Sequence, residues 1–552
     1  MRIYKPMFLT TLAVVTLASC GSVKNLAVPT MDTAVLITAK KGAVSDEQFN
    51  HWAHADLATD TIPGMSVDKA YKFLEGKKGE TVVVAVIDSG IDIEHEDLKD
   101  VLWTNPKEIA GNKIDDDKNG FVDDIHGWNF LGGDRVDAPE QLEITRIVAK
   151  LNPRFEGEKI EDIRAEDKAD FEKYQEYLKA FEASSSSFFN RMERLAQIEE
   201  NFNDIKKFLG KDSFTLEDLQ VVKTEDKKLQ AQIGDVLGLL GRGFDEKSFL
   251  EYYEGQKRNK SYDFNFNGRE IVGDNPEDIA DTKYGNGIVI GSTEIESHGT
   301  HVSGIILATR NNGIGINGVA HNAKLMSVRA VPDGDERDKD VALAIRYAVD
   351  NGAKVINMSF GKSWSPNPEW VFDAIKYAEK HDVLLVHAAG NDGKDIDVKG
   401  NWPNDSADKV VEIADNVLTI GAMSSSYNEE LPASFTNYGQ KNVDVYAPGV
   451  QIYSTVPQNE YARYNGTSMA SPEVAGVAAL VRSYYPQLSA SQVKHIIMNS
   501  GIEVDMDVLV PGSKSKENPI GEKVKFSKLS ISGRVANAYN ALVLADKMVN
   551  KS

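Results

Sequence analysis

Three runs of consecutive apolar residues, rich in β-branched side chains, constrain the fold of this 552-residue chain more than any other feature. Each is typical of a strand buried on both faces of a parallel sheet. The runs lie in Thr81–Gly90, Lys354–Gly361 and Val383–Asn391 and are separated by helical patterns. We therefore predict an α/β three-layer sandwich, with a mostly parallel central sheet, right-handed crossovers and helices on both faces.

Two of these strands end on a polar residue, Asp88 in one case and Asn391 in the other. Open α/β sheets bind their ligands at the carboxyl ends of the strands, so we expect both side chains at the same edge of the sheet. A nucleophile candidate, Ser468, stands among small residues in Gly466–Pro472, with an apolar helical pattern after it. A serine hydroxyl needs a base and an orienting carboxylate, and His298 and Asp88 supply these residue types.

The segments around Asp88, His298 and Ser468, in this order, resemble the subtilisin family of serine proteases (peptidase family S8). The resemblance runs from about Ser66 to the C-terminus, apart from one large insertion. It implies a subtilisin-like serine endopeptidase with an Asp88–His298–Ser468 triad. It also implies that Asn391 supplies the side-chain amide of the oxyanion hole, beside the backbone N–H of Ser468.

The resemblance also assigns a substrate-binding edge, at which an extended peptide pairs as an added strand. The expected contact residues are Ser359, Phe360, Gly361, Ala388, Ala389 and Gly390. Asp392, which follows Asn391, either tilts the rim of this site toward basic side chains or is an exposed acid with no role beyond solvation.

The N-terminus has the layout of an export signal, with Arg2 and Lys5 before the apolar run Met7–Ala18. The run is shorter than the ~20 apolar residues of a membrane-spanning helix. Leu17–Cys20 resembles a bacterial lipobox, so we expect a lipoprotein signal over residues 1–19, acylation of Cys20, and a tether over residues 20–65. The alternative is an ordinary signal peptide with an incidental cysteine. We expect an envelope protein anchored to the outer membrane or the cell surface.

Cys20 is the only cysteine, so the exported fold has no disulfide and calcium is the expected staple. Oxygen ligands alternate around a glycine in Lys113–Asp124, which predicts a calcium loop, although a solvated turn is the alternative. The ligands expected there are Asp115, Asp117, Asn119 and Asp123, or Asp124 in place of the last. The family resemblance implies a second calcium site at Asp97, Asn312, Ile314 and Ile316.

The predicted peptidase domain spans residues 66–546 and contains an insertion over residues 134–267 that is rich in Glu and Lys. Its apolar residues recur at helical spacing in two sets, which predicts two or more amphipathic helices. The sets are Phe171, Tyr174, Leu178 and Phe181, then Phe188, Met192, Leu195 and Ile198. A lid over the cleft and a peripheral helical hairpin are both open interpretations.

The formal charge of −22, from 84 acidic and 62 basic residues, argues against nucleic-acid binding. We expect protein or peptide substrates, a membrane contact through the lipid, and a monomer. Two other classes of function are a non-catalytic binding module on a protease scaffold and a metal hydrolase that uses His298 and His301. The His298–His301 spacing lacks the i, i+4 pair and the glutamate of a zinc helix, and we expect His301 to be a packed structural residue.

Overall fold

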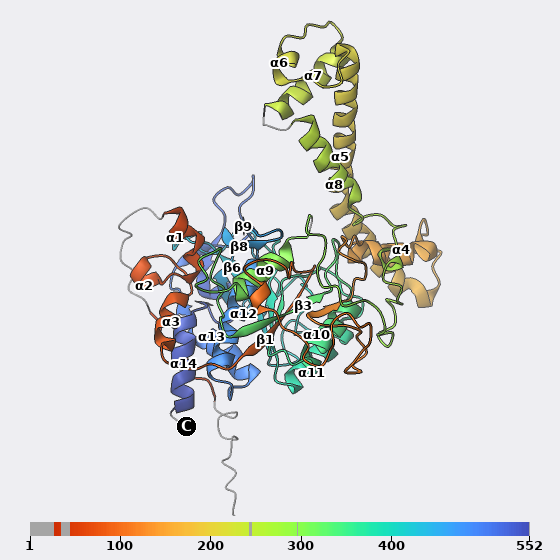
Figure 1. The fold of residues 1–552 in the computed structure, drawn as a ribbon. Helices are drawn as coiled ribbons and strands as arrows, with labels where there is room; N and C mark the ends of the chain where they lie inside the picture. The colour runs from red at the N-terminus through yellow and green to blue at the C-terminus, as the bar shows by residue number, and fades with distance from the viewer. Residues whose placement is uncertain (1–26, 35–44, 242–244, 295, 551–552) are drawn as a thin grey trace, which may run out of the picture.

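A nine-stranded sheet forms the centre of the protein in the computed structural model, which describes residues 27–34, 45–241, 245–294 and 296–550 (Figure 1). The strand order is β10-β13-β7-β6-β5-β4-β1-β3-β2, and every neighbouring pair is parallel except β10 with β13. The strands are β1 Val82–Asp88, β2 Gly127–Asn129, β3 Ala323–Arg329, β4 Val355–Met358, β5 Leu384–Ala388, β6 Val417–Met423, β7 Val445–Pro448, β10 Ile502–Glu503 and β13 Arg534–Val535. Two hairpins lie outside this sheet, β8 Ile452–Val456 with β9 Glu460–Tyr464 and β11 Asp507–Leu509 with β12 Lys523–Lys525.

Alternate side chains of the central strands enter two separate hydrophobic cores. Val84 and Val86 of β1 pack in the core that contains α9 and α12, whereas Ala85 and Ile87 pack in the core that contains α10 and α11. The predicted three-layer α/β sandwich is therefore confirmed, and the continuous apolar runs reflect strands that are buried on both faces. The helices of these layers are α3 Val67–Leu74, α9 His298–Leu307, α10 Asp338–Asp350, α11 Pro368–Lys380, α12 Thr467–Tyr484, α13 Ala490–Ser500 and α14 Ala538–Asn550.

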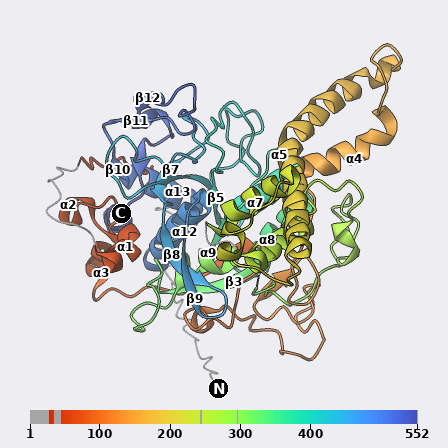
Figure 2. The same ribbon diagram turned by 90° about the horizontal axis from the view of Figure 1, so that it is seen from above.

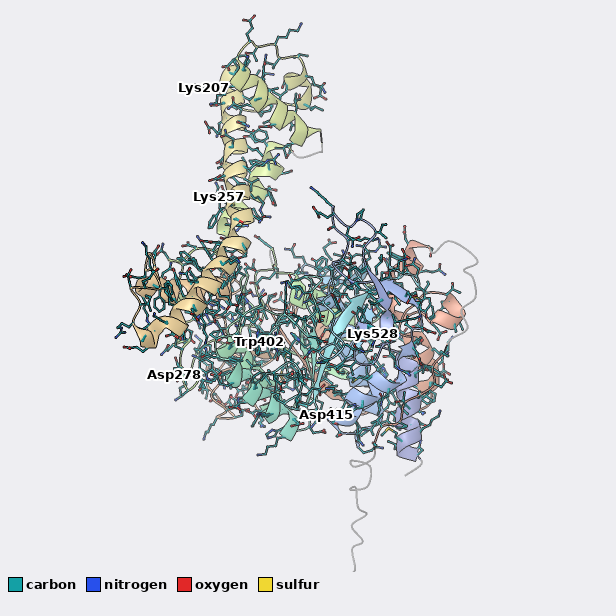
Figure 3. The ribbon with its side chains drawn as sticks, turned by 180° about the vertical axis from the view of Figure 1, so that it is seen from behind. Lys207, Lys257, Asp278, Trp402, Asp415 and Lys528 are labelled. Carbon is teal, nitrogen blue, oxygen red and sulfur yellow. The ribbon has the colours of Figure 1, made fainter. Side chains whose placement is uncertain are left out.

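A group of helices is inserted between β2 and α9, and part of this group extends from the body of the molecule as a column (Figure 1). Its members are α4 Glu143–Phe155, α5 Lys168–Leu209, α6 Leu216–Gln220, α7 Lys227–Leu240 and α8 Glu246–Arg258. The first half of α5 packs on α4 beside the body, and its second half packs on α7 and α8 in the column (Figure 2). Seen from behind, Lys207 lies near the end of the column and Lys257 lies nearer the body (Figure 3).

Both predicted apolar sets of the insertion lie on the single helix α5, which is 42 residues long. Phe171, Tyr174 and Phe181 enter the core shared with α4, and Leu195 and Ile198 enter the core shared with α7 and α8. No glycine or proline interrupts the helix between the two sets, so the chain changes packing partners without a turn.

The segment that precedes β1 packs against the body through two short helices and a 3₁₀ turn. These are α1 Asp46–Asn50, α2 Leu57–Asp60 and Trp52–His54. Trp52 is 1% exposed and its indole N–H donates to the Val450 carbonyl at 3.2 Å, so one aromatic residue fixes this segment to the body. Cys20 and the signal lie outside the described residues. Within the described ranges, no helix is both long and apolar enough to cross a membrane.

Candidate active site

Asp88 and His298 meet at the carboxyl edge of the sheet. Asp88 is the last residue of β1 and is 1% exposed, while His298 is the first residue of α9. The Asp88 Oδ1 atom lies 2.8 Å from His298 Nδ1. Burial opposes the charged imidazolium, but the neighbouring Asp88 carboxylate outweighs it and raises the pKa of His298 above its ordinary value. The carboxylate thus holds Nδ1, and Nε2 remains available to act as a base.

Ser468 stands in the first turn of α12 and lines the same cleft as His298. Its hydroxyl donates to the Ser359 carbonyl at 3.0 Å, and the Ser359 hydroxyl donates back to the Ser468 carbonyl at 2.9 Å. The nucleophile therefore has to exchange this bond for one to His298 before it can react. Nucleophile–base bonds are often loose without substrate and tighten in the complex.

Asn391 follows β5 and projects its amide toward the start of α12. Its Oδ1 accepts from the Thr467 backbone N–H at 2.8 Å and from the Thr467 hydroxyl at 3.0 Å. These two bonds fix which end of the amide faces away from the helix, and that end is the donor Nδ2. A Cβ placed on Gly466 would lie 3.5 Å from the Ser468 backbone nitrogen and 3.7 Å from Asn391 Nδ2. The two oxyanion donors expected from the sequence therefore flank one small open space.

The expected substrate edge is brought to the same cleft with one exception. Ser359, Phe360, Gly361, Ala388 and Gly390 line it. Ala389 does not line the cleft, because its side chain is fully buried in the core. Its carbonyl accepts from Asn401 and Asn437 at 3.0 and 2.8 Å, so this residue supports the pocket from behind.

Asn401 is a cleft residue that the sequence did not indicate. A Cβ on Gly361 would lie 3.2 Å from Asn401 Oδ1, and one on Gly390 would lie 3.4 Å from the same atom. The Asn401 amide thus fills the space between the two glycines of the substrate edge. Its position in an irregular loop after β5 carries no periodic signal, which is why the pattern analysis missed it.

The insertion forms part of the cleft wall. The cleft has a volume of about 1360 Å³, and its lining includes Leu142, Ile144, Glu176, Ala180, Ala183 and Ser184. These residues come from α4, from the segment before it and from the first half of α5. This half of the insertion therefore forms wall rather than periphery, whereas none of the described residues of α7 or α8 lines the cleft, and the lid function stays a prediction.

The acidic loop places three carboxylates together. One oxygen each from Glu108, Asp115 and Asp117 lies within 4.8 Å of the others, a donor set that suits a hard divalent cation. Asp123 is not part of this group of three, and its two oxygens accept from the backbone N–H groups of Gly111 and Lys113 at 2.9 and 2.8 Å.

Asn119 is turned away from the three carboxylates of the loop. Its Nδ2 donates to Asp124 at 3.1 Å, and its Oδ1 accepts from the Phe121 N–H at 2.8 Å. The structure therefore favours Glu108, Asp115 and Asp117 over the predicted set, and Glu108 was missed because it precedes the glycine turn.

Around Asp97 the residues of the second expected calcium site do come together. Asp97 is fully buried, and burial raises its pKa above the ordinary value. Its oxygens accept from Asn312 Nδ2 at 2.7 Å and from the Ile316 N–H at 3.2 Å, while Ile314 lies on the exposed side of this loop. The oxygens of Asp97 thus accept from N–H donors of the Asn312–Ile316 turn, and calcium at this place stays a prediction of the family resemblance.

His301 is a structural residue, as predicted. Its Nε2 lies 3.1 Å from the carbonyls of both Ile452 and Ala462, and its ring stacks on Tyr464 at a centroid distance of 4.3 Å. Burial lowers its pKa to about 3, so it stays neutral. The ring stacks on Tyr464 and Nε2 faces two carbonyl oxygens, which argues against a metal site formed with His298.

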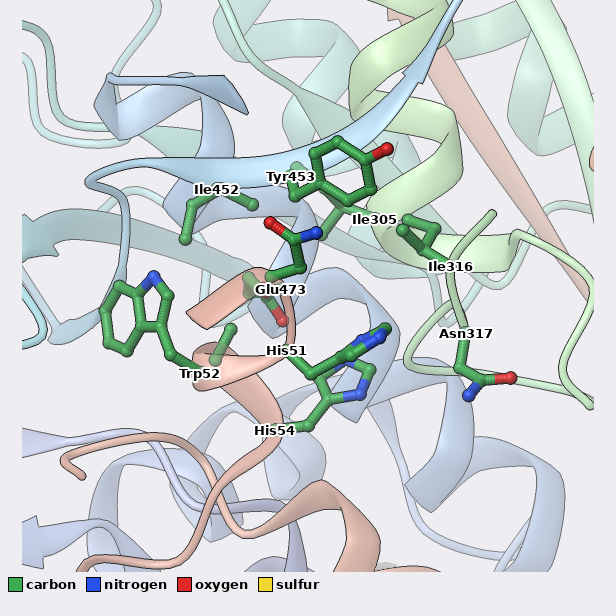
Figure 4. A pocket seen from close by; sticks show the side chains of 11 residues that line it. His51, Trp52, His54, Ile305, Ile316, Asn317, Ile452, Tyr453 and Glu473 are labelled. Carbon is green, nitrogen blue, oxygen red and sulfur yellow. The ribbon is translucent and has the colours of Figure 1, made fainter. Parts of the chain in front are cut away.

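A small polar pocket lies beneath the N-terminal segment, between His51, His54 and Glu473 of α12 (Figure 4). Glu473 is 2% exposed, and its Oε2 makes no hydrogen bond. Burial raises its pKa well above the ordinary value. The carboxyl therefore faces the protein interior behind α12, away from the cleft that holds Ser468.

The fold and the site together define a serine hydrolase of the α/β class, with an Asp–His pair and a helix-borne serine at the carboxyl edge of a parallel sheet. The sequence model of the Subtilase family matches this chain over residues 79–521. The chain therefore belongs to the Subtilase family, whose members are serine endopeptidases.

Three relatives illustrate the similarity. The thermophilic serine proteinase of Bacillus sp. (strain AK1) is 42% identical over 191 residues, which cover 34% of this chain and 43% of the relative. Subtilisin DY of Bacillus licheniformis is 39% identical over 208 residues, 37% of this chain and 70% of the relative. Subtilisin Savinase of Lederbergia lenta is 38% identical over 205 residues, 37% of this chain and 69% of the relative. The aligned part thus spans less than half of the first relative's length.

Among solved structures, the prenylagaramide maturation protease PagA aligns with a TM-score of 0.35 and 27% sequence identity, covering 45% of this chain and 82% of that chain.

Proposed function

We propose that this protein is a serine endopeptidase that hydrolyses extracytoplasmic proteins while anchored to the cell envelope. The observation that carries the catalytic part is the 2.8 Å contact between Asp88 and His298 in a cleft that also holds Ser468 and Asn391. No other cluster among the described residues combines a nucleophile, a base and an oriented amide donor at one sheet edge.

In the proposed mechanism, Ser468 Oγ attacks the substrate carbonyl carbon and passes its proton to His298 Nε2. Asp88 holds the imidazole by Nδ1 and stabilises the imidazolium that forms. The oxyanion of the tetrahedral intermediate accepts from Asn391 Nδ2 and from the Ser468 backbone N–H, which flank the open space beside Gly466.

His298 then gives the proton to the leaving amine as the carbon–nitrogen bond breaks, and an acyl-enzyme on Ser468 remains. Water attacks the acyl carbon, with His298 again as base, and hydrolysis releases the new carboxylate and restores the serine hydroxyl. The acyl part of the substrate would lie along Ser359–Gly361, which lines the cleft beside Ser468.

Two calcium ions are proposed as structural cofactors. The first would be held by Glu108, Asp115 and Asp117. The second, which rests on the family resemblance, would be held by Asp97 with oxygens of the Asn312–Ile316 turn. Bound calcium would neutralise the mutual repulsion of the three loop carboxylates and the buried charge of Asp97.

The envelope location rests on the sequence of the N-terminus, where an apolar run precedes Leu17–Cys20. Radiolabelled palmitate should be incorporated into the wild-type protein during expression in a bacterial host, and Cys20→Ala should abolish it. Absence of label in the wild type would refute the lipid anchor and leave the catalytic proposal intact.

The catalytic proposal is tested by digesting an unfolded protein and mapping the new termini by mass spectrometry. Wild-type enzyme should produce internal cleavages that the Ser468→Ala variant does not produce. Cleavages that persist in Ser468→Ala at the wild-type rate would refute the assignment of the nucleophile.

A further inference from the structure

One wall of the active-site cleft carries an excess of acidic groups. We call this group the Glu336 cluster. Its residues come from the segment between β3 and α10, from the start of α10, from α4 and the segment before it, and from the position after Gly361. Its acids are Glu140, Glu143, Asp335, Glu336 and Asp338, and its bases are Arg146, Arg337 and Lys362. Five carboxyls therefore face three cations.

The three cations of the cluster donate hydrogen bonds to groups other than the Glu336 carboxyl. Lys362 Nζ donates to Glu143 at 2.7 Å, to Asp338 at 2.8 Å and to the Glu336 carbonyl at 2.8 Å, which uses all three of its hydrogens.

The two arginines also donate to other groups. Arg146 is divided between the Glu143 carboxylate and three backbone carbonyls, and Arg337 pairs with Glu140 at 2.9 Å. None of these hydrogen bonds reaches the carboxyl group of Glu336.

Glu336 is thus left with a free acceptor in a buried place. The residue is 2% exposed, it lines the cleft, and its Oε1 makes no hydrogen bond. Burial raises its pKa to about 8, so the carboxyl is mostly protonated at neutral pH in the free enzyme and becomes an anionic acceptor when a cation binds beside it. A buried carboxyl oxygen without a donor is costly, and such atoms in native structures usually have a partner that the coordinates do not contain.

The place of Glu336 connects it to the bound peptide. The Lys362 contact to the Glu336 carbonyl sets this residue beside the end of the Ser359–Gly361 edge, where the acyl part of an extended substrate would pair. Glu176 and Asp333 line the same cleft and are exposed, and they add to its negative potential. A cationic group on the substrate would find a field that attracts it, and it would reach the unpaired Oε1, which is buried in the free enzyme, by displacing the side chains that cover this atom.

We propose that Glu336 is a specificity-determining residue that receives a cationic group of the peptide substrate on the amino side of the scissile bond. The cation is an ammonium or guanidinium, carried either by a Lys or Arg side chain or by the free N-terminus of a short peptide. The inference rests on the peptidase function proposed above. It differs from the rim preference expected at Asp392, whose carboxylate already pairs with Lys394 at 3.1 Å.

The first test uses a series of acetylated peptide amides, each with arginine at a different position before the scissile bond. Each peptide is paired with one in which citrulline, the neutral isostere, replaces the arginine. A second pair of peptides without basic residues differs only in N-terminal acetylation. Wild-type enzyme should show a roughly tenfold higher kcat/KM for the cationic member of one pair, mainly through KM, since a charge-assisted hydrogen bond is gained. The pair that responds identifies the source of the cation.

The Glu336→Gln variant keeps the shape of the side chain and should reduce this ratio to within about twofold. Asp392→Asn is the matched control, because it removes an acid from the same cleft, and it should retain the wild-type ratio. Equal kcat/KM values for cationic and neutral peptides in the wild type would overturn the proposal without any variant. A tenfold ratio that persists in Glu336→Gln would overturn it as well.

Labelling with a fluorophosphonate separates this proposal from the peptidase function. A wild-type enzyme that labels and cleaves peptides without cation preference refutes the role of Glu336 alone. An enzyme that does not label refutes the peptidase function on which the role depends.

Discussion

Single residues decide the chemistry of the site through the bonds that orient them. Thr467 donates twice to Asn391 Oδ1, so Nδ2 is the end of the amide that faces the reacting oxygen. An oxyanion donor fixed in this way acts on the transition state more than on the bound substrate. Its loss should therefore affect turnover more than affinity.

The Asn391→Ala substitution tests this donor. It should lower kcat by about 10²–10³ and leave KM within a few-fold of wild type. Asn401→Ala is the matched control, because Asn401 lies between the glycines of the substrate edge and should change KM more than kcat. Steady-state kinetics on one peptide amide check both variants. A drop in kcat of less than tenfold for Asn391→Ala would contradict the assignment.

The pH profile tests the Asp88–His298 pair. The base must be neutral, and Asp88 raises the pKa of His298, so kcat/KM should decline toward acid with a midpoint above the ordinary value of about 6.5. In Asp88→Asn the opposing effect of burial remains alone, so the midpoint should move to lower pH while the maximum falls. A midpoint that does not move would show that Asp88 does not control the ionisation of His298.

At this scale the sequence predicts the residues at strand ends and helix starts, because periodicity locates those positions. Asp88 and Asn391 are located in this way. The small-residue motifs around His298 and Ser468, together with the resemblance to the subtilisin family, supply the rest of the site, and the structure places all four residues in one cleft. Glu108, Glu336 and Asn401 are missed because they lie in irregular segments. Their roles depend on side-chain direction and on which donors are already committed, and neither property has a periodic signature.

At the scale of elements, helix α5 links two environments. Its first half packs on α4 and lines the cleft, while its second half forms the column with α7 and α8. The apolar sets of this helix are visible in the sequence, but its continuity is not, because only tertiary packing decides whether two helical stripes share one axis. The two halves should respond differently to the same kind of substitution.

The column can be destabilised without loss of the active site. Phe202 is 1% exposed in the column core, so Phe202→Ala should cost about 3–5 kcal/mol of local packing and expose the column to limited proteolysis. The rate of fluorophosphonate labelling should stay within about twofold of wild type. Tyr174→Ala, which removes a residue 2% exposed in the core beside the cleft, should change peptide KM. Equal effects of the two variants on peptide KM would contradict this division.

At the scale of the whole molecule, the chain carries a formal charge of −22, and the repulsion between its acidic groups lowers the stability of the folded state. With one cysteine, the chain has no intramolecular disulfide to offset this repulsion. Calcium at the two proposed sites would bind the folded state and raise its stability. The composition and the loop sequence predict such an ion and its place, and the structure shows that the carboxylates of Glu108, Asp115 and Asp117 converge there.

Thermal unfolding tests the proposed loop site. Chelation of calcium should lower the Tm of wild-type protein by about 5 °C or more, as expected when a ligand stabilises the folded state by a few kcal/mol. Asp117→Asn should reduce this calcium-dependent increment, because it removes one of the three converging oxygens. Asp123→Asn should keep the increment, since the Asp123 carboxylate is not among the three that converge. An equal increment in wild type and Asp117→Asn would contradict the assignment of the loop.

The most direct test of the central claim is active-site labelling of the signal-free protein with a fluorophosphonate probe. The account predicts covalent label on Ser468 in wild-type protein, located by peptide mapping, and none in Ser468→Ala. It also predicts labelling slowed by orders of magnitude in His298→Ala, because the base is lost. Label on another residue, or labelling of Ser468 at the wild-type rate in His298→Ala, would contradict the assembled Asp88–His298–Ser468 site.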